Sequence, residues 1–259
     1  MSHENGSANV NPANACSGRF FGDAGIGPGS RVLDVGCGNG DLSRLVARLA
    51  GPRGEVVAID RSEAALSTAS AAGADPEAAP IHYRTADLSG ELPNLGRFDA
   101  IVGRRVLMYL PDISATLARL VALAAPGAML AFQEHARGQL PFGLDALPLH
   151  CRLYDWMWDT VAAEGGDVTL GYGLVEQMEA KGLAIVHARS EGVLVQPGTP
   201  SFLPTLTRIM LPRFLEHGVT TAEEVELDTL ARRIEDERGR VGGTIVWDQA
   251  FFVAARVRS

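Results

Sequence analysis

Hydrophobic residues along the chain follow two patterns that alternate with each other. Residues 41–50 carry apolar side chains at helical spacing, so one face of this segment can pack against a sheet, and Gly51 and Pro52 then end the helix. On either side lie short, mainly aliphatic runs, which predict buried strands. Strands and helices that alternate in this way favour an α/β fold with a parallel sheet. The runs cover residues 31–35, 55–60, 81–87, 98–103 and 128–135.

The part of the chain after residue 135 has a less regular pattern. Residues 141–163 are apolar on more than one face, which is typical of a helix that is buried on several sides or borders a cavity. A shorter amphipathic helix is predicted to follow, and two strands with a helical insertion between them complete the chain. The predicted ranges are helix 174–181, strand 184–196, helices 202–217 and 222–240, the latter heavily charged and mostly solvated, and strand 245–256.

The first predicted strand leads into a glycine-rich loop. Residues 31–40 read RVLDVGCGNG, with Asp34 inside the strand and glycines at every second position from Gly36 to Gly40. Because glycine has no side chain, such a loop lets the backbone approach an adenosyl group closely and turn sharply into a helix. A dinucleotide loop has the spacing Gly-x-Gly-x-x-Gly, whereas this one is Gly-x-Gly-x-Gly, which disfavours a dehydrogenase. The alternative is an ordinary glycine-rich turn.

Two further predicted strands also end in acidic residues. Asp60 follows the second strand, about 20 residues after the glycine loop, where an adjacent parallel strand offers a carboxylate to ribose hydroxyls. Asp87 ends the third strand. Each acid alone has a simpler interpretation, since Asp60 could cap the helix that opens at Ser62 and Asp87 could merely end its strand. Together with the glycine loop, the two acids favour a nucleotide-type cofactor site.

Five segments of the chain resemble one known superfamily. They read VLDVGCGNGD, VVAIDRS, ADL, FDAIVGRRVLMYLPD and PGAMLAFQEH. Their order and spacing are similar to those of class I S-adenosylmethionine-dependent methyltransferases, in particular the small-molecule branch of ubiquinone/menaquinone type and of actinobacterial natural-product enzymes. The resemblance covers about residues 19–135. It implies a Rossmann-like, seven-stranded, mostly parallel sheet with helices on both faces, a helical lid, and S-adenosylmethionine across the carboxyl ends of the first strands.

The resemblance also implies which residues bind the cofactor. The glycine loop would cradle the adenosyl sulfonium, with Asp60 on the ribose and Asp87 beside the adenine. Arg104 would meet the methionine carboxylate, and S-adenosyl-L-homocysteine would be the product. The expected cofactor-binding residues are Asp34, Gly36, Cys37, Gly38, Gly40, Asp60, Arg61, Asp87, Leu88, Gly103 and Arg104.

We expect one large domain preceded by a short segment. A chain of 259 residues with 46% hydrophobic content is long enough for a single α/β domain with its own core. Residues 1–18 form the expected flexible N-terminal segment, because their first part is rich in Asn and Ser and lacks a hydrophobic period. Phe20 and Phe21 could fold over the cofactor or pin a short helix to the sheet. The methyltransferase domain then spans residues 19–259, with helical lid insertions at about 138–170 and 197–243.

Composition narrows the possible partners. A net charge of −8 argues against nucleic acid, whose binding needs clustered Lys and Arg. All apolar runs are far shorter than the ~20 residues of a membrane span, and no charged-then-apolar leader opens the chain. We therefore expect a cytoplasmic protein with a small-molecule acceptor and no membrane partner. Three scattered cysteines are too few for a disulfide framework or a zinc cluster, and no metal site is predicted.

Methyl transfer from a sulfonium makes few chemical demands on the protein, because the leaving group departs neutral. Alignment of the nucleophile, the methyl carbon and the sulfur in a closed site can supply up to ~7–11 kcal/mol of the barrier. A base is needed only if the acceptor must lose a proton, and the candidates are Tyr109, Glu134 and His135. We prefer His135, which titrates nearest neutrality, although the family often has an acid where Glu134 stands. Strand alternation sends these two to opposite faces, and a pair making only local hydrogen bonds is the alternative.

The acceptor is expected to be a small aromatic metabolite of indole or phenol type, methylated at C, N or O, in secondary metabolism. Aromatic residues of the predicted helix 141–163 could wall such a planar ring, although core packing explains them more simply. They are Phe142, Tyr154, Trp156 and Trp158. The alternative function is an enzyme that retains the cofactor and catalyses a non-methylating step such as a cyclisation. The acidic balance and the sequence GRRVL at 103–107 disfavour a protein or nucleic-acid methyltransferase.

Overall fold

The computed structural model of the protein describes residues 13–138, 147–196 and 198–258. Within these residues the chain forms two compact units. The larger unit contains Ala15–Ala136, Gly166–Glu191 and the chain from Ala250 onward, and the smaller unit contains Arg137–Gly165 and Gly192–Gln249. All the predicted cofactor-binding residues and candidate bases lie in the larger unit.

The described strands form a seven-stranded sheet of order β3-β2-β1-β4-β5-β7-β6. Strands β1 to β5 pair in parallel, and β7 runs antiparallel to β5. The predicted α/β fold with a seven-stranded, mostly parallel sheet is therefore confirmed. The strands are β1 (Arg31–Val35), β2 (Glu55–Asp60), β3 (Ile81–Thr85), β4 (Phe98–Arg104), β5 (Ala124–His135), β6 (Ala184–Val195) and β7 (Ile245–Arg256).

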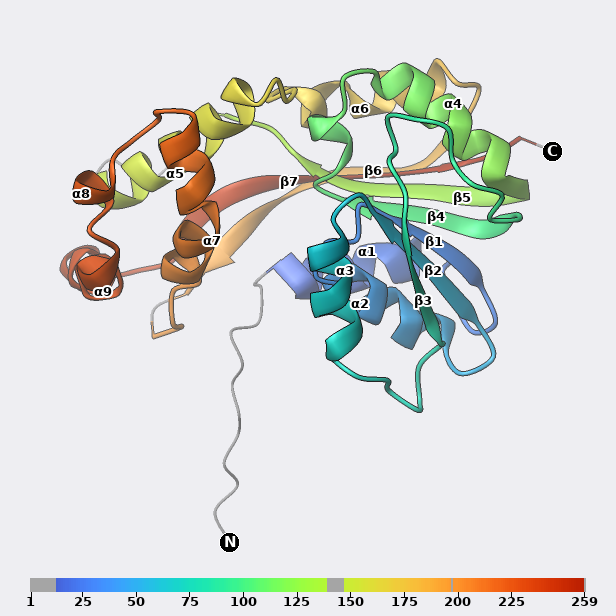
Figure 1. The fold of residues 1–259 in the computed structure, drawn as a ribbon, viewed down its shortest axis with the longest axis horizontal. Coiled ribbons are helices and arrows are strands. Elements are labelled where there is room, and N and C mark those ends of the chain that lie inside the picture. Colours follow the sequence, from blue (N-terminus) through green and yellow to red (C-terminus); the bar gives the residue numbers. More distant parts are fainter. Residues whose placement is uncertain (1–12, 139–146, 197, 259) are drawn as a thin grey trace, which may run out of the picture. The chain divides into compact units, whose positions relative to one another are not determined.

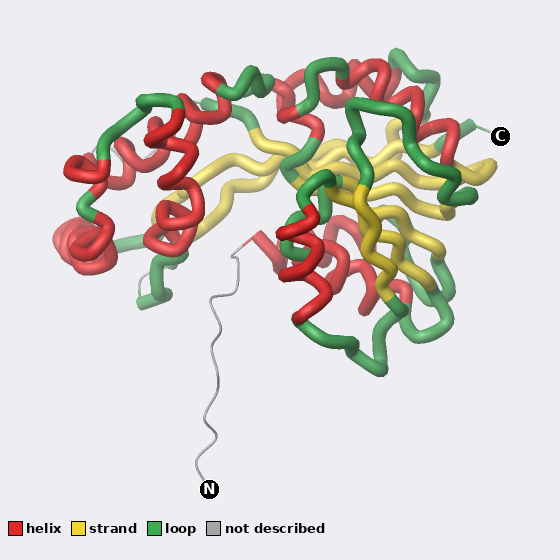
Figure 2. The backbone as a smooth tube through the Cα atoms, viewed as in Figure 1, coloured by secondary structure: helices red, strands yellow, loops and turns green. Residues whose placement is uncertain are grey.

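Helices cover both faces of the sheet in the larger unit, as the resemblance implies (Figure 1). Helices α1, α2 and α3 lie on one face, and α4 and α6 lie on the other (Figure 2). Between them Leu33, Ile101 and Phe132 on the central strands are fully buried. The helices are α1 (Ala13–Asp23), α2 (Asp41–Ala50), α3 (Glu63–Ala71), α4 (Ile113–Leu123) and α6 (Leu170–Glu179), and a short 3-10 helix, η1, covers Leu107–Tyr109.

The parallel strands bring the predicted site residues to one edge of the sheet. Val35 at the end of β1 lies beside Ile59 of β2 and Gly103 of β4. Strand β5 continues this edge, because Gln133 pairs with Arg104. The loops after β1, β2, β4 and β5 therefore leave the sheet next to one another, at the edge where open α/β sheets bind ligands.

Helix α2 begins and ends where its glycines predict. It starts after Gly40, whose φ is 78°, and stops before Gly51, whose φ of 62° is also in the region that favours glycine. Leu42, Leu45 and Val46 are among its buried residues. The predicted apolar stripe is thus the face by which α2 packs on the sheet, and this packing fixes the glycine loop that precedes the helix.

Helix α1 starts at Ala13, within the segment 1–18 that is expected to be flexible. The side chains of Phe20 and Phe21 are fully buried. The ring of Phe20 lies 5.1 Å from that of Phe252 on β7, in a tilted arrangement. This packing pins the helix to the sheet, which is the second of the two roles considered for these rings.

The smaller unit contains helices α5, α7, α8 and α9. Residues 139–146, including Phe142, lie outside the described residues, so the start of the helix predicted at 141 is not described. The single helix predicted over 222–240 is two helices, because Glu226 has a φ of 46° between them. Among the described residues, no helix has both the length and the apolar character of a bilayer span. The bounds are α5 (Pro148–Ala163), α7 (Leu203–Glu216), α8 (Ala222–Val225) and α9 (Leu227–Val241).

Aromatic rings fill the interior of the smaller unit. The ring of Trp247 lies 5.9 Å from the ring of Tyr154 and 5.9 Å from that of Phe202, with edge-to-face geometry in both pairs. Trp158 packs on Tyr154 at 6.1 Å, and both side chains are buried. Contacts of this kind stabilise a core. Core packing therefore accounts for Tyr154 and Trp158 within this unit.

A buried carboxylate ties α9 to the start of α5. Glu237 accepts hydrogen bonds from the backbone N–H groups of Leu149 at 2.7 Å and His150 at 3.1 Å. Its Oε2 also lies 2.6 Å from Nδ1 of the His150 ring, which donates because a carboxylate only accepts. The first N–H groups of a helix lack partners within the helix. Glu237 supplies partners to two of them at the beginning of α5.

Candidate active site

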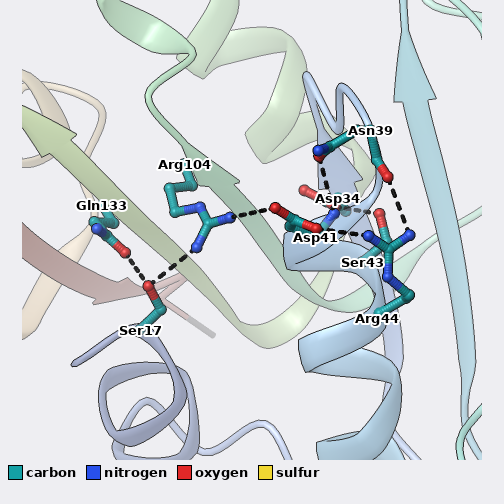
Figure 3. Close-up of polar contacts among 8 residues, drawn as sticks. All are labelled: Ser17, Asp34, Asn39, Asp41, Ser43, Arg44, Arg104 and Gln133. Atoms are coloured by element: carbon teal, nitrogen blue, oxygen red, sulfur yellow. Dashed lines mark hydrogen bonds and ion pairs between the residues drawn. The ribbon is translucent and has the colours of Figure 1, made fainter. Parts of the chain in front are cut away.

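A buried carboxyl group lies at the centre of the candidate site. Asp34 on β1 is fully buried, and its Oδ2 accepts a hydrogen bond from the Ser43 hydroxyl at 2.6 Å (Figure 3). Its other oxygen, Oδ1, has no hydrogen-bond partner. Burial raises the pKa of Asp34 to about 7, although Ser43 and Arg104 both lower it. Because an unpartnered buried oxygen is costly, this geometry suits a site in which a ligand supplies the missing donor.

The glycine loop is shaped by positive φ angles and by close neighbours. Gly36, Gly38 and Gly40 have φ angles of 64°, 52° and 78°, in the left-handed region. A Cβ on Gly36 would lie 2.3 Å from Cγ2 of Val106, and a Cβ on Gly40 would lie 2.8 Å from the Tyr83 hydroxyl. In contrast, a Cβ on Gly38 would meet no protein atom within 4 Å. The loop is therefore tightly packed at both ends and open at Gly38, where a ligand can approach the backbone.

Asp60 holds the glycine loop from the neighbouring strand. Its Oδ2 accepts a hydrogen bond from the N–H of Gly38 at 2.9 Å, and its Oδ1 accepts one from the N–H of Ser62 at 2.9 Å. The second bond goes to the residue just before α3, but the cap of that helix is Ser62 itself, whose hydroxyl accepts the Ala65 N–H at 3.2 Å. Arg61 beside it is exposed. Asp60 thus joins the loop after β1 to the loop after β2 with a single carboxylate.

Cys37 is a packing residue within the loop. Its buried side chain lies in a small hydrophobic cluster with Ala58 and Leu66. Burial raises the pKa of the Cys37 thiol far above its ordinary value, and the nearby Asp34 and Asp60 raise it further. A thiol in these surroundings stays neutral and inert. The contribution of Cys37 is therefore its size, together with a backbone N–H that donates to the Ile59 carbonyl at 3.0 Å.

The loop after β3 carries the predicted adenine contacts. Asp87 is exposed, and its Oδ1 accepts a hydrogen bond from the N–H of Ser89 at 2.8 Å. The side chain of Leu88 is buried, and its carbonyl accepts a hydrogen bond from Arg119 on α4 at 2.7 Å. The second bond anchors the loop to α4, and the first closes a turn within the loop itself.

Arg104 belongs to a polar cluster that joins α1, α2, β4 and β5 (Figure 3). One of its terminal nitrogens donates to the Ser17 hydroxyl at 3.4 Å, and the other lies 4.0 Å from the Asp41 carboxylate. The Ser17 hydroxyl donates in turn to Oε1 of Gln133. Burial lowers the pKa of Arg104, but a guanidinium stays charged in proteins. The cluster places a cation beside the glycine loop, where it suits an anionic group of a ligand.

Ser17 and Gln133 are site residues that sequence reasoning missed. Gln133 is fully buried, and its Nε2 has no hydrogen-bond partner. The signal that could have identified it is an amide side chain within the aliphatic run 128–135, since buried polar groups need partners. Ser17 gives no such signal, because it lies in the segment that is expected to be flexible.

Glu134 and its neighbours on β5 differ in their surroundings. Glu134 is fully buried, and its Oε1 accepts hydrogen bonds from the N–H groups of Val106 at 3.0 Å and Leu107 at 2.9 Å. Burial raises the pKa of Glu134 to about 7, although these amides lower it. His135 is buried as well, and strand alternation places it on the same face as Gln133. The face of β5 that carries the Arg104 cluster is therefore the face of His135.

Tyr109 lies in η1 with its side chain partly exposed. It follows the turn at Arg105, a non-glycine residue with a φ of 54°. In the part of the chain that the structure describes, no group of three or more His, Cys, Asp or Glu is arranged to hold a metal ion.

The two buried carboxyl groups should make the stability of the ligand-free protein depend on pH. Their pKa values of about 7 in the folded chain exceed the ordinary values of 3.8 for Asp34 and 4.5 for Glu134. The stabilisation is therefore complete at low pH and is lost as the pH rises through about 7. Each contribution is on the order of 2–4 kcal/mol. Thermal unfolding of Asp34→Asn and the wild type between pH 5 and 8 should show a flatter profile for the variant, and parallel profiles would contradict this.

The geometry is that of an α/β protein whose glycine loop, acidic side chains and Arg104 cluster lie at the carboxyl edge of its parallel strands. A family model described as a methyltransferase domain matches residues 26–183, more than half of the chain. The chain belongs to this family, within the class I S-adenosylmethionine-dependent methyltransferases. The superfamily expected from the sequence is thereby confirmed.

Individual relatives agree with this assignment. Over 116 residues the chain is 37% identical to the 2-phytyl-1,4-naphtoquinone methyltransferase of Synechococcus elongatus, a match that covers 44% of this chain and 49% of that one. The chain therefore spans about half the length of this curated relative. Two crystal structures share the fold. A Bacillus halodurans C-125 protein described as a methyltransferase has a TM-score of 0.60 at 14% identity, and the match covers 95% of this chain and 100% of that one. The [4+2]-cyclase SpnF has a TM-score of 0.57 at 18% identity, and the match covers 99% of this chain and 86% of that one.

The residues at this edge fit S-adenosylmethionine, the cofactor of the superfamily. Asp34 offers an unpartnered buried oxygen to a donor, and Gly38 leaves open space beside the loop backbone. The guanidinium of Arg104 is a cation that can pair with a methionine carboxylate. The predicted cofactor is thus consistent with the side chains present.

Proposed function

We propose that the protein transfers a methyl group from S-adenosylmethionine to C, N or O of a small aromatic metabolite of indole, phenol or quinol type. The observation that carries the proposal is the glycine loop, open at Gly38 and bordered by the carboxyl groups of Asp34 and Asp60. This arrangement supports cofactor binding at the edge where β1, β2 and β4 end. Membership of the methyltransferase family supports methyl transfer as the reaction.

A planar aromatic acceptor is supported by the relatives rather than by the aromatic side chains of this chain. The curated relative described above methylates a naphthoquinone, according to its name. In the smaller unit, the ring of Tyr154 packs against those of Trp158 and Trp247. We therefore base the acceptor class on the planar naphthoquinone ring in that relative's name. The sequence resemblance to natural-product enzymes leads us to place the methylation in secondary metabolism.

Cofactor binding is proposed to use three strand ends. Asp60 would hold the ribose while keeping Gly38 in place, and the loop at Asp87 and Leu88 would hold the adenine. Arg104, held between Ser17 and Asp41, would hold the methionine carboxylate. Gly36, Cys37, Gly40 and Gly103 complete the proposed set through backbone shape and packing, and the exposed Arg61 would contact the cofactor from the loop after β2. Most of the rate enhancement then comes from alignment in a closed site.

The proton balance of the reaction gives His135 its proposed role. When bound, S-adenosylmethionine supplies an electrophilic methyl group, whose bond to sulfur breaks with the electron pair leaving on a neutral thioether as the acceptor forms the new bond. An acceptor hydroxyl, amine or carbon must then lose a proton. His135 lies on the face of β5 that carries the Arg104 cluster, and a neutral imidazole can take that proton. Tyr109 in η1 would orient the acceptor.

The activity can be tested directly. The protein is incubated with S-adenosylmethionine labelled in its methyl group and with a panel of phenols, quinols and indoles, and masses are measured for acceptor and cofactor product. We expect one acceptor class to gain the labelled methyl group and an equal amount of S-adenosylhomocysteine to form. Cofactor-dependent conversion of an acceptor without S-adenosylhomocysteine would instead indicate the cyclase-type alternative.

His135→Ala is expected to slow turnover by roughly 10²–10⁴-fold, the usual contribution of a general base, while the dissociation constant for S-adenosylhomocysteine changes little. Turnover and calorimetric titration measure the two effects separately. Because His135 is buried, thermal unfolding of the variant is recorded in parallel. Full activity in a folded variant would mean that alignment suffices and that no base acts at this position.

A further inference from the structure

The carboxylate of Glu134 accepts hydrogen bonds from the backbone that follows β4. Its Oε1 receives two N–H groups, from Val106 and Leu107, and the side chain is fully buried. Helix η1 has no other side-chain cap at its start, because the preceding residue is Val106. The other oxygen, Oε2, is buried without a hydrogen-bond partner. The hydrogen bonds that the Glu134 carboxyl group does make therefore both go to the backbone at the start of η1.

The segment that Glu134 holds is a tight turn. The Arg105 N–H still donates to the Gln133 carbonyl at 2.8 Å, as in the sheet, but Arg105 itself has a φ of 54°. A left-handed non-glycine residue costs about 1–2 kcal/mol and persists only when its surroundings hold it. The two hydrogen bonds to Glu134 begin at the next residue, so they are placed to keep the turn closed.

The side chain of Val106 connects this turn to the glycine loop. A Cβ on Gly36 would lie 2.3 Å from Cγ2 of Val106, and a Cβ on Gly103 would lie 2.7 Å from its Cγ1. The isopropyl group therefore occupies the space that both glycines leave free. Any shift of the Val106 backbone must move this group against Gly36, within the proposed cofactor seat.

We propose that Glu134 is a positioning residue, which holds Val106 against Gly36 and Gly103 through the backbone amides of η1 and thereby fixes the shape of the cofactor-binding loop. It does not act as the proton acceptor of the reaction. The inference rests on the proposed function and deepens it, because it separates the two neighbouring candidates, with Glu134 shaping the site and His135 facing the acceptor.

Two substitutions at Glu134 distinguish positioning from proton transfer. Glu134→Gln keeps an oxygen that can accept both amide hydrogens, whereas Glu134→Leu removes it. We expect Glu134→Gln to retain turnover and the dissociation constant for S-adenosylhomocysteine within about threefold. Glu134→Leu should raise that constant at least roughly tenfold, which corresponds to ~1.4 kcal/mol. If the glutamine variant loses turnover as severely as the leucine variant while both bind the cofactor normally, Glu134 is the base and the proposal is wrong.

A third variant tests the connection without touching the carboxylate. Val106→Ala should also raise the dissociation constant for S-adenosylhomocysteine several-fold, although the Glu134 bonds remain. Val56→Ala on β2 is the matched control, since it removes the same atoms from a fully buried position at the opposite end of the strands. Equal dissociation constants for Val106→Ala and Val56→Ala would contradict the proposed connection, even if Glu134→Leu fails to fold.

Amide hydrogen exchange separates this inference from the proposed function. Exchange at Cys37 and Gly38 is measured without ligand in the wild type, Glu134→Gln and Glu134→Leu. Faster exchange in the leucine variant alone would support the positioning role, and unchanged exchange in both would overturn it. Titration of the wild type with S-adenosylhomocysteine tests whether the protein binds the cofactor product. Failure of the wild type to bind would refute the proposed function, and the exchange result would still decide the role of Glu134.

Discussion

Gly36→Ala is expected to destabilise the protein and to abolish measurable cofactor binding. Its φ of 64° costs an L-residue about 1–2 kcal/mol, and the added methyl group would lie 2.3 Å from Val106, a clash that costs typically ~1–3 kcal/mol to relieve. For a chain of this size the melting temperature should fall by roughly 5–15 °C. The loss of cofactor affinity should be larger than the loss of stability, because Val106 can move away from the new methyl group only together with η1. Thermal unfolding and calorimetric titration with S-adenosylhomocysteine measure the two effects.

Two other glycines serve as controls for the backbone cost. Gly127 has a φ of 75° and Gly38 a φ of 52°, and a Cβ on either meets nothing within 4 Å. Gly127→Ala lies away from the site and should lower the melting temperature slightly with no effect on binding. Gly38→Ala should weaken binding more than it weakens the fold, because its methyl group fills the space proposed for the ligand. Identical behaviour of Gly36→Ala and Gly127→Ala would contradict a role for the Val106 contact.

Asp60→Ala should weaken S-adenosylhomocysteine binding roughly 10–100-fold. The substitution removes the proposed ribose contact and the acceptor that holds Gly38, and hydrogen bonds to a charged group are worth ~1.5–3 kcal/mol. Asp60→Asn retains one acceptor oxygen, so its loss of affinity should be smaller. Equilibrium titration of both variants provides the comparison.

Asp75→Ala is the matched control for Asp60→Ala. The Asp75 carboxylate accepts a hydrogen bond from the N–H two residues later, as Asp60 does from Ser62, but it lies in an exposed loop between α3 and β3. Its removal should leave the dissociation constant unchanged. An unchanged constant in Asp60→Ala as well would remove the ribose assignment.

The strand pattern and the glycine loop were predictable because each follows from local chemistry. Aliphatic runs in a parallel sheet are buried on both faces, so β1, β2 and β4 stand out as continuous apolar segments. The glycines stand at positions where φ is positive, and only their spacing was needed to recognise the loop. The bounds of β2, α2 and β7 agree with the predicted ranges to the residue.

Features that depend on distant contacts could not be predicted. The Ser17 to Gln133 bond joins residues far apart in the chain, and neither side chain has a periodic pattern. The Glu134 bonds to η1 depend on the turn at Arg105, which no local motif specifies. Glu226 interrupts a continuous charged helical pattern with a left-handed residue, which propensity does not favour.

Helix α4 has a start signal in the sequence. Asp112 caps its first turn by accepting the N–H of Ala115 at 2.7 Å, and Leu117 and Leu120 form a buried stripe. An acidic residue before an apolar run of period 3 to 4 is a standard helix start. The helix also anchors the loop at Leu88 through Arg119, so it contributes to the proposed adenine pocket.

Glu237 takes two backbone N–H groups and a ring N–H from a single turn at the start of α5. Helix α9 and that turn should therefore open and close as one cooperative block in native-state proteolysis, rather than fraying separately. Substitutions at the contacts inside this block would be tolerated poorly. Diversification among close homologues is accordingly expected on helix surfaces that leave Glu237 and His150 unchanged.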